Sequence, residues 1–236
     1  MRMIPPLLVL GLLPLLGRCG ETEAPSDEPT AALPFDSAPL APGEHRLVSG
    51  AGDTLRLRAL EPERGRQRLV TTRVGSPDSI SVLVDIVTKM PIESYRRAGG
   101  AEGDTLTARL EYGRGFEGQA RLTLTAPQGA GIENLRTPPP SIDAGQLPLS
   151  LAALPFGTVD SLHFNYVAPF EKRALAALLV VGALDTLRIG GEALPAWPVL
   201  LRVSGLEEGA WFAAEPPHAL LRLEERTRRR TWTRIP

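Results

Sequence analysis

Short runs of alternating apolar and polar residues follow one another from about residue 46 to the end of the chain. The stretch from Thr54 to Leu60 shows the pattern most clearly, because its leucines alternate with arginines. A period of two places successive side chains on opposite faces and is typical of a strand with one buried face. We therefore predict a mainly β fold built from hairpins over residues 46–236.

An aspartate followed by Thr or Ser and then by Leu or Ile recurs where these runs begin. The matches are Asp53-Thr54-Leu55, Asp78-Ser79-Ile80, Asp104-Thr105-Leu106, Asp160-Ser161-Leu162 and Asp185-Thr186-Leu187. Aspartate favours turns because its side chain accepts hydrogen bonds from nearby backbone N–H groups, and the residues that follow it here favour strands. None of the matches has the D-x-D-x-D-G spacing of a calcium loop, so we predict turns that open strands.

Two segments differ from this pattern. Residues 143–154 carry regularly spaced leucines, and Pro148 and Pro155 limit any helix there to about two turns. Residues 171–184 are apolar on nearly every face, so periodicity leaves both a helix and a strand open. The Asp185-Thr186-Leu187 match that follows favours a strand from about Ala176.

The N-terminus has the form of an export signal. A charged start is followed by an uncharged, leucine-rich stretch over residues 4–17, which is short for a membrane span and interrupted by proline. Cys19 follows Leu16-Gly17-Arg18, which resembles the bacterial lipobox apart from Arg18, where that motif prefers a small residue. We predict a lipoprotein-type signal peptide over residues 1–19 with lipid attached to Cys19, the alternative being ordinary signal cleavage.

Residues 20–45 are predicted to form a tether between the lipid anchor and the domain. The segment is rich in acidic residues and proline, and its residues 20–44 hold no Lys or Arg. Low hydrophobicity combined with like charges disfavours folding, and proline stiffens the chain. Leu33 and Phe35 offer the alternative that this part docks on the domain.

Composition narrows the classes of function. The 236 residues are 43% hydrophobic and carry a net charge of −1, so the basic excess of a nucleic-acid-binding protein is missing. The single cysteine excludes an internal disulfide and a multi-cysteine metal site. We expect one domain, no cofactor and no nucleic-acid partner.

The sequence offers little for catalysis. His45, His163 and His218 are widely separated and lie in no metal-binding spacing, and the chain has neither a nucleophile elbow nor a phosphate loop. We therefore predict a non-enzymatic protein without a metal site, a hydrolase being the weaker alternative.

The C-terminal stretch carries a cluster of arginines: Arg222, Arg226, Arg228, Arg229, Arg230 and Arg234. One interpretation is a contact surface for anionic lipid headgroups. The favoured one is a solvated hairpin whose arginine stems cover apolar surface.

A further set of residues carries a resemblance over about residues 46–235. These are Asp78-Ser79-Ile80, Val84-Asp85, Thr88, Pro91-Ile92, Ser94-Tyr95-Arg96, Asp143, Leu147-Pro148-Leu149, Leu154-Pro155, Trp197, Val199, Val203, Ala210-Trp211-Phe212 and Leu220-Leu221-Arg222. In this pattern the chain resembles an uncharacterised family of bacterial periplasmic lipoproteins, similar to the Lol lipoprotein carriers and their receptor. The resemblance implies a curved antiparallel sheet that forms an open half-barrel around an apolar cavity, with a plug at residues 147–156.

The cavity wall implied by the resemblance consists of aromatic and leucine side chains. They are Leu110, Tyr112, Leu122, Leu124, Leu151, Phe156, Phe164, Tyr166, Trp197 and Trp211. We expect an outer-membrane lipoprotein facing the periplasm that binds lipid or another apolar cargo there. Gly20 fits outer-membrane sorting, since inner-membrane retention signals usually have Asp after the cysteine. The alternative is a module with a filled interior that docks another envelope protein.

Overall fold

The computed structural model describes residues 32–99, 104–113 and 118–235, and it is mainly β, as predicted. A single sheet of 16 strands contains every strand of the described residues, and the sheet is not closed. Neighbouring strands are antiparallel except for the pair β9–β10. No helix within the described ranges is long and apolar enough to cross a membrane.

The first half of the sheet, here called the N-terminal arm, is a meander in which each strand pairs with the next. Its strands are β1 (Gly43–Ser49), β2 (Thr54–Ala59), β3 (Arg66–Arg73), β4 (Ser79–Asp85), β5 (Pro91–Gly99), β6 (Thr105–Tyr112), β7 (Gln119–Ala126) and β8 (Gly129–Arg136). Sequential pairing of this kind follows from short hairpin connections.

The second half, the C-terminal arm, returns to the first strand. Its elements are β9 (Ser141–Asp143), β10 (Ser161–Ala168), β11 (Arg173–Val181), β12 (Asp185–Ile189), β13 (Glu192–Val203), β14 (Leu206–Ala213), β15 (Leu220–Glu225), β16 (Arg230–Arg234) and the 3₁₀ turns η3 (Pro169–Glu171) and η4 (Arg226–Arg228). β16 pairs with β1 and joins the arms into one sheet, while β12 pairs only with β13.

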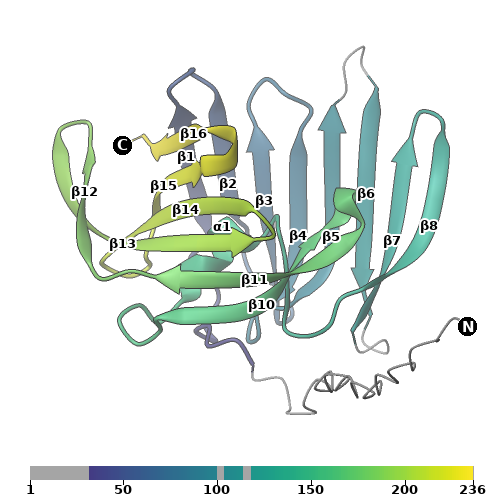
Figure 1. Ribbon diagram of the computed structural model, residues 1–236, viewed down its shortest axis with the longest axis horizontal. Coiled ribbons are helices and arrows are strands. Elements are labelled where there is room, and N and C mark those ends of the chain that lie inside the picture. The colour runs from purple at the N-terminus through teal and green to yellow at the C-terminus, as the bar shows by residue number, and fades with distance from the viewer. Residues whose placement is uncertain (1–31, 100–103, 114–117, 236) are drawn as a thin grey trace, which may run out of the picture.

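The sheet is folded over so that the two arms form layers (Figure 1). Strands β3–β8 stand roughly upright behind, and β10, β11, β13 and β14 cross in front, while β12 stands at the left edge of the view. Near the far end of the N-terminal arm the layers meet again, because β8 contacts β11 and β6 contacts η3. The sheet stays open, but because its two arms face one another, they surround an interior that is reached from the gap between them.

Local sequence signals locate the strand starts correctly. Strands begin directly after Asp53, Asp78, Asp104 and Asp160, and β12 begins at Asp185 itself. The side chain of Asp78 accepts a hydrogen bond from the N–H of Gly99 at 2.9 Å, so this aspartate also ties two hairpins together. The apolar segment 171–184 is the strand β11, and residues 147–153 form a short α-helix and a 3₁₀ turn.

That helical segment fills the interior. Helix α1 (Leu147–Ser150) and turn η2 (Leu151–Ala153) lie between the arms, and with residues up to Phe156 they make up the plug. The leucines at 147, 149, 151 and 154 are buried in the main core cluster, which also includes residues from both arms. The plug therefore replaces an empty half-barrel cavity with packed side chains.

The tether expected over residues 20–45 is wrong for its second part, because residues 33–40 pack on the domain, as in the docking alternative for Leu33 and Phe35, and β1 begins at Gly43. Phe35 and Leu40 are buried in the main cluster. The buried Gln67 side chain donates to the carbonyl of Leu40 at 2.7 Å and accepts from its N–H at 2.9 Å. The ammonium of Lys89 donates to the carbonyl of Ala38 at 2.5 Å. Cys19 and the rest of the signal and tether lie outside the described residues.

Candidate functional site

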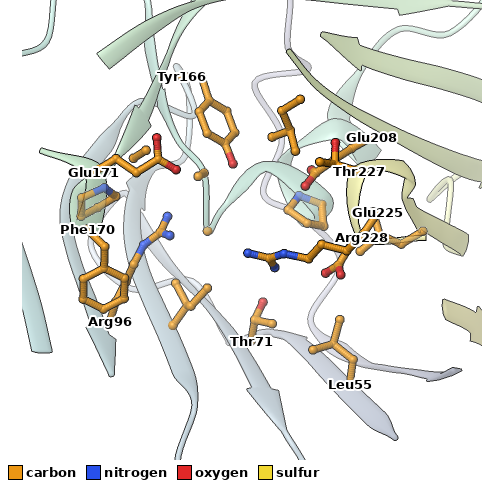
Figure 2. Close-up of a pocket in the computed structure, with 18 of the residues that line it drawn as sticks. Leu55, Thr71, Arg96, Tyr166, Phe170, Glu171, Glu208, Glu225, Thr227 and Arg228 are labelled. Carbon is orange, nitrogen blue, oxygen red and sulfur yellow. The ribbon is translucent and has the colours of Figure 1, made fainter. Parts of the chain in front are cut away.

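A pocket of about 420 Å³ opens between the arms beside the plug, and we call it the arm pocket (Figure 2). Its lining residues are Leu55, Leu57, Thr71, Ile80, Arg96, Ala144, Gly145, Pro148, Tyr166, Ala168, Pro169, Phe170, Glu171, Leu206, Glu208, Leu223, Glu225, Thr227 and Arg228. Both arms, the turn before α1 and the 3₁₀ turns η3 and η4 contribute to it. Its volume lies in the range typical of small-molecule sites.

The floor of the arm pocket is a row of residues paired across four strands. Leu57 of β2 pairs with Thr71 of β3, Thr71 with Ile80 of β4, and Ile80 with Arg96 of β5. Residues directly opposite one another in an antiparallel sheet point to the same face. The floor is thus apolar at one end and ends in a guanidinium at the other.

The guanidinium of Arg96 belongs to a buried polar network. One of its terminal nitrogens donates to Oδ1 of Asp143 at 2.6 Å, and the hydroxyl of Tyr112 donates to Oδ2 of the same carboxylate at 2.8 Å. The N–H of Gly145 donates to Oδ1 at 2.8 Å. Asp143 is 0% exposed and the Arg96 side chain 12% exposed, so water does little to screen this ion pair.

Burial and charge together set the protonation states of this network. Burial alone would raise the pKa of Asp143, but the Arg96 guanidinium and the Gly145 N–H hold it below its usual value. Burial and the Asp143 carboxylate hold the pKa of Tyr112 well above its usual value, so the phenol stays protonated and donates. The network therefore fixes β5, β6 and the turn before α1 relative to one another.

The opposite wall of the arm pocket carries two carboxyl groups. Glu208 of β14 and Glu225 of β15 are directly paired across the strands. Burial, together with the Glu225 carboxylate, raises the pKa of Glu208 to about 7. Glu208 therefore carries only part of a negative charge at neutral pH.

The wall residues implied by the resemblance are divided among several places. Leu110 and Leu122 are fully buried in a second core cluster with Val167 of β10, and Tyr112 and Leu124 pack against that cluster. Leu151 and Phe164 are buried in the main cluster, with Phe156 packed against it. Of the ten residues only Tyr166 lines the arm pocket. The expected cavity wall is thus packed with its own side chains.

The two tryptophans of that set lie on opposite faces of the C-terminal arm. Trp197 stacks on Phe156 of the plug, with ring centroids 5.8 Å apart. Trp211 instead packs against a small cluster that contains Leu187 and Leu221, and Arg222 lies over its ring at 5.7 Å. Ala210 and Phe212 face the main core, so the alternation of β14 directs Trp211 outward.

The three histidines lie on separate parts of the described fold. His45, His163 and His218 lie on β1, on β10 and in the turn before β15. Nδ1 of His218 is 3.0 Å from the carbonyl oxygen of Ala213, and its ring meets Phe156 edge-on. Within the described ranges no three His, Cys, Asp or Glu side chains gather as a metal site would require.

Glu208 and Arg96 line the arm pocket but were not predicted as site residues, although the sequence holds a signal for both. Glu208 alternates in phase with Leu206, Ala210 and Phe212, which face the interior, and Arg96 is in phase with the buried Ser94. A charged residue in the inward phase of a strand must be paired or line a pocket. Which phase points inward depends on the tertiary structure, so the signal is clear only once the strands are paired.

Comparison with protein-family models, with curated proteins and with solved structures finds no match. The resemblance to the Lol carriers and their receptor therefore stays a prediction from the sequence pattern. Any function for this chain has to be argued from the arm pocket and the N-terminal signal.

Proposed function

We propose that this protein is a non-enzymatic lipoprotein of the bacterial cell envelope, anchored through Cys19, that binds one small amphipathic ligand in the arm pocket. The observation that carries the proposal is a pocket of about 420 Å³ with an apolar floor and a charged rim. Ligand sites in proteins are typically concave and apolar with a few placed polar groups. Leu55 and Ile80 offer the apolar surface, and Arg96 and Glu208 the polar groups.

The sequence pattern led us to expect lipid or another apolar cargo in a half-barrel cavity. Because the interior is filled, the cargo that we propose is smaller. A neighbouring pocket beside the plug, lined by Leu147, Leu151 and Leu201 among others, has a volume of only about 20 Å³. No room remains there for several acyl chains, because each leucine of the plug occupies core volume. The ligand we propose is therefore a single-chain or similarly small amphiphile at the mouth of the fold.

A second function, docking of another envelope protein, is favoured by one feature. Strand β8 is the outermost strand of the N-terminal arm and pairs only with β7 among the described strands. Seven of its eight residues are exposed, including Ile132 at 62%. An exposed strand edge is suited to accept an extended peptide as an added strand. The test below separates this alternative from ligand binding.

Native mass spectrometry of the full chain, extracted with detergent from a bacterial envelope, tests the proposal. We expect a chain that begins at a lipid-modified Cys19 and carries one non-covalent ligand, which solvent extraction releases for identification. An unmodified chain would contradict the anchor. A lipidated chain without ligand, which also takes up no fluorescent fatty-acid probe, would contradict the binding function and leave docking through β8 as the better account.

A further inference from the structure

Three members of the C-terminal arginine cluster are held in local contacts. Arg226 pairs with Glu207 and Glu224 at 3.7 and 3.6 Å, and Arg222 lies over Trp211. Arg230 lies over Trp232 at 5.4 Å. Arg228 lies on the exposed turn η4 and lines the arm pocket. No carboxylate of the described residues lies within ion-pair distance of its guanidinium.

Arg228 faces Arg96 across the arm pocket. Figure 2 shows the two guanidinium groups pointing toward one another from opposite walls, Arg96 from β5 and Arg228 from η4. The hydroxyls of Tyr166 and Thr71 point into the same space from above and below. Two positive charges directed at one gap repel each other unless a negative group lies between them.

Several hydrogen-bond donors point into this gap. Arg96 uses one terminal nitrogen on Asp143, while its buried Nε has no hydrogen-bond partner among the described residues. Burial holds the pKa of Tyr166 well above its usual value, so its hydroxyl keeps the proton that it donates. A guanidinium offers several N–H groups in a planar fork that matches a phosphate or carboxylate.

Three carboxyl groups also line the arm pocket and have to be accounted for. Glu171 is paired with Arg173 at 3.1 Å. Glu208 is partly protonated at neutral pH, since Glu225 lies opposite it. Glu225 stands on the same wall as Arg228 and offsets part of its charge. Each of the three carboxyl groups is thus paired with an arginine, partly protonated or placed beside Arg228, and both guanidinium groups stay directed at the gap.

We infer that the ligand of the arm pocket carries an anionic group, a phosphate or a carboxylate, which binds between Arg96 and Arg228 while its apolar part lies on Leu55 and Ile80. This inference rests on the proposed function, because it names the polar end of the ligand in the same pocket. Arg96 is held in place by Asp143, and Arg228 stands on an exposed turn that can follow the ligand.

Binding of three probes to the full chain tests the anionic group and the apolar part of the ligand separately. Lysophosphatidic acid and the monoacylglycerol with the same chain differ only in the phosphate, and inorganic phosphate lacks the chain. We expect lysophosphatidic acid to bind at least about tenfold more tightly than monoacylglycerol, since a charge-assisted hydrogen bond has this magnitude. Arg228→Gln should remove most of the difference, and Arg229→Gln, one residue on, should leave it unchanged.

The outcomes distinguish the anionic group from the pocket itself. Equal binding of the two lipids, or equal losses in Arg228→Gln and Arg229→Gln, would overturn the anionic group and leave the proposed amphiphile site standing. Tight binding of inorganic phosphate without any binding of monoacylglycerol would support the arginine pair but overturn the amphiphile. Binding of none of the three probes would overturn the proposed function and this inference together.

Discussion

Replacing Asp143 with Asn is expected to destabilise the protein by about 3–5 kcal/mol, because it leaves the buried Arg96 guanidinium without its carboxylate. Tyr112 and Gly145 also lose a charged acceptor. In a domain of this size the loss corresponds to roughly 10 °C or more in Tm, measured by thermal unfolding at pH 7. The exposed counterpart Asp53→Asn, whose carboxylate is 43% exposed and 3.4 Å from Arg73, should cost less than about 1 kcal/mol.

The pH dependence of stability and a double variant separate the effect of the Asp143 charge from that of its side-chain shape. The pKa of Asp143 is lowered in the folded state, so its contribution is present above its usual value of 3.8 and is lost as the pH falls through the lowered pKa. Asp143→Asn should lack this part of the acid destabilisation. The double variant Arg96→Met/Asp143→Leu should recover much of the loss at pH 7. Equal effects of Asp143→Asn and Asp53→Asn would contradict a buried network.

Truncating Leu154 to Ala is expected to cost about 2–5 kcal/mol, because the change opens a cavity where the plug packs between the arms. Leu154 is 2% exposed and belongs to the main core cluster. Leu184→Ala removes the same atoms from a side chain that is 50% exposed, and it should cost less than about 1 kcal/mol. Denaturant unfolding at constant pH measures both. Similar losses in the two variants would mean that the plug does not fill the interior.

The parts of the fold that depend on neighbouring residues could be predicted from the sequence. The turn chemistry of Asp53, Asp78, Asp104 and Asp160 located strand starts, since an aspartate caps a turn whatever lies elsewhere in the chain. Leucine spacing between Pro148 and Pro155 indicated the short helix in the same way. Segment 171–184 could be assigned as a strand only with the help of the residues that follow it. Its strand β11 is apolar because it lies between β10 and β13 in the sheet.

Contacts between distant residues could not be predicted. Phe35 and Leu40 read as linker residues by composition, but Gln67 and Lys89 satisfy the backbone polar groups of their segment and allow the two side chains to be buried. Trp211 looked like a cavity residue because an aromatic side chain carries no mark of which face its strand presents. Arg96 and Arg228 are far apart in the sequence and meet only because the sheet folds over.

A substitution that fills the arm pocket shows whether the ligand binds there. Thr71 lies in the floor of the arm pocket, and its neighbour Thr72 points to the opposite face of β3. Phenylalanine at either position keeps strand propensity, so the pair differs only in the face that it crowds. Binding of a fluorescent fatty-acid probe to the full chain should weaken by roughly tenfold or more in Thr71→Phe, a loss of about 1.4 kcal/mol, and stay unchanged in Thr72→Phe. Equal probe binding by both variants and the wild type would contradict a ligand in the arm pocket.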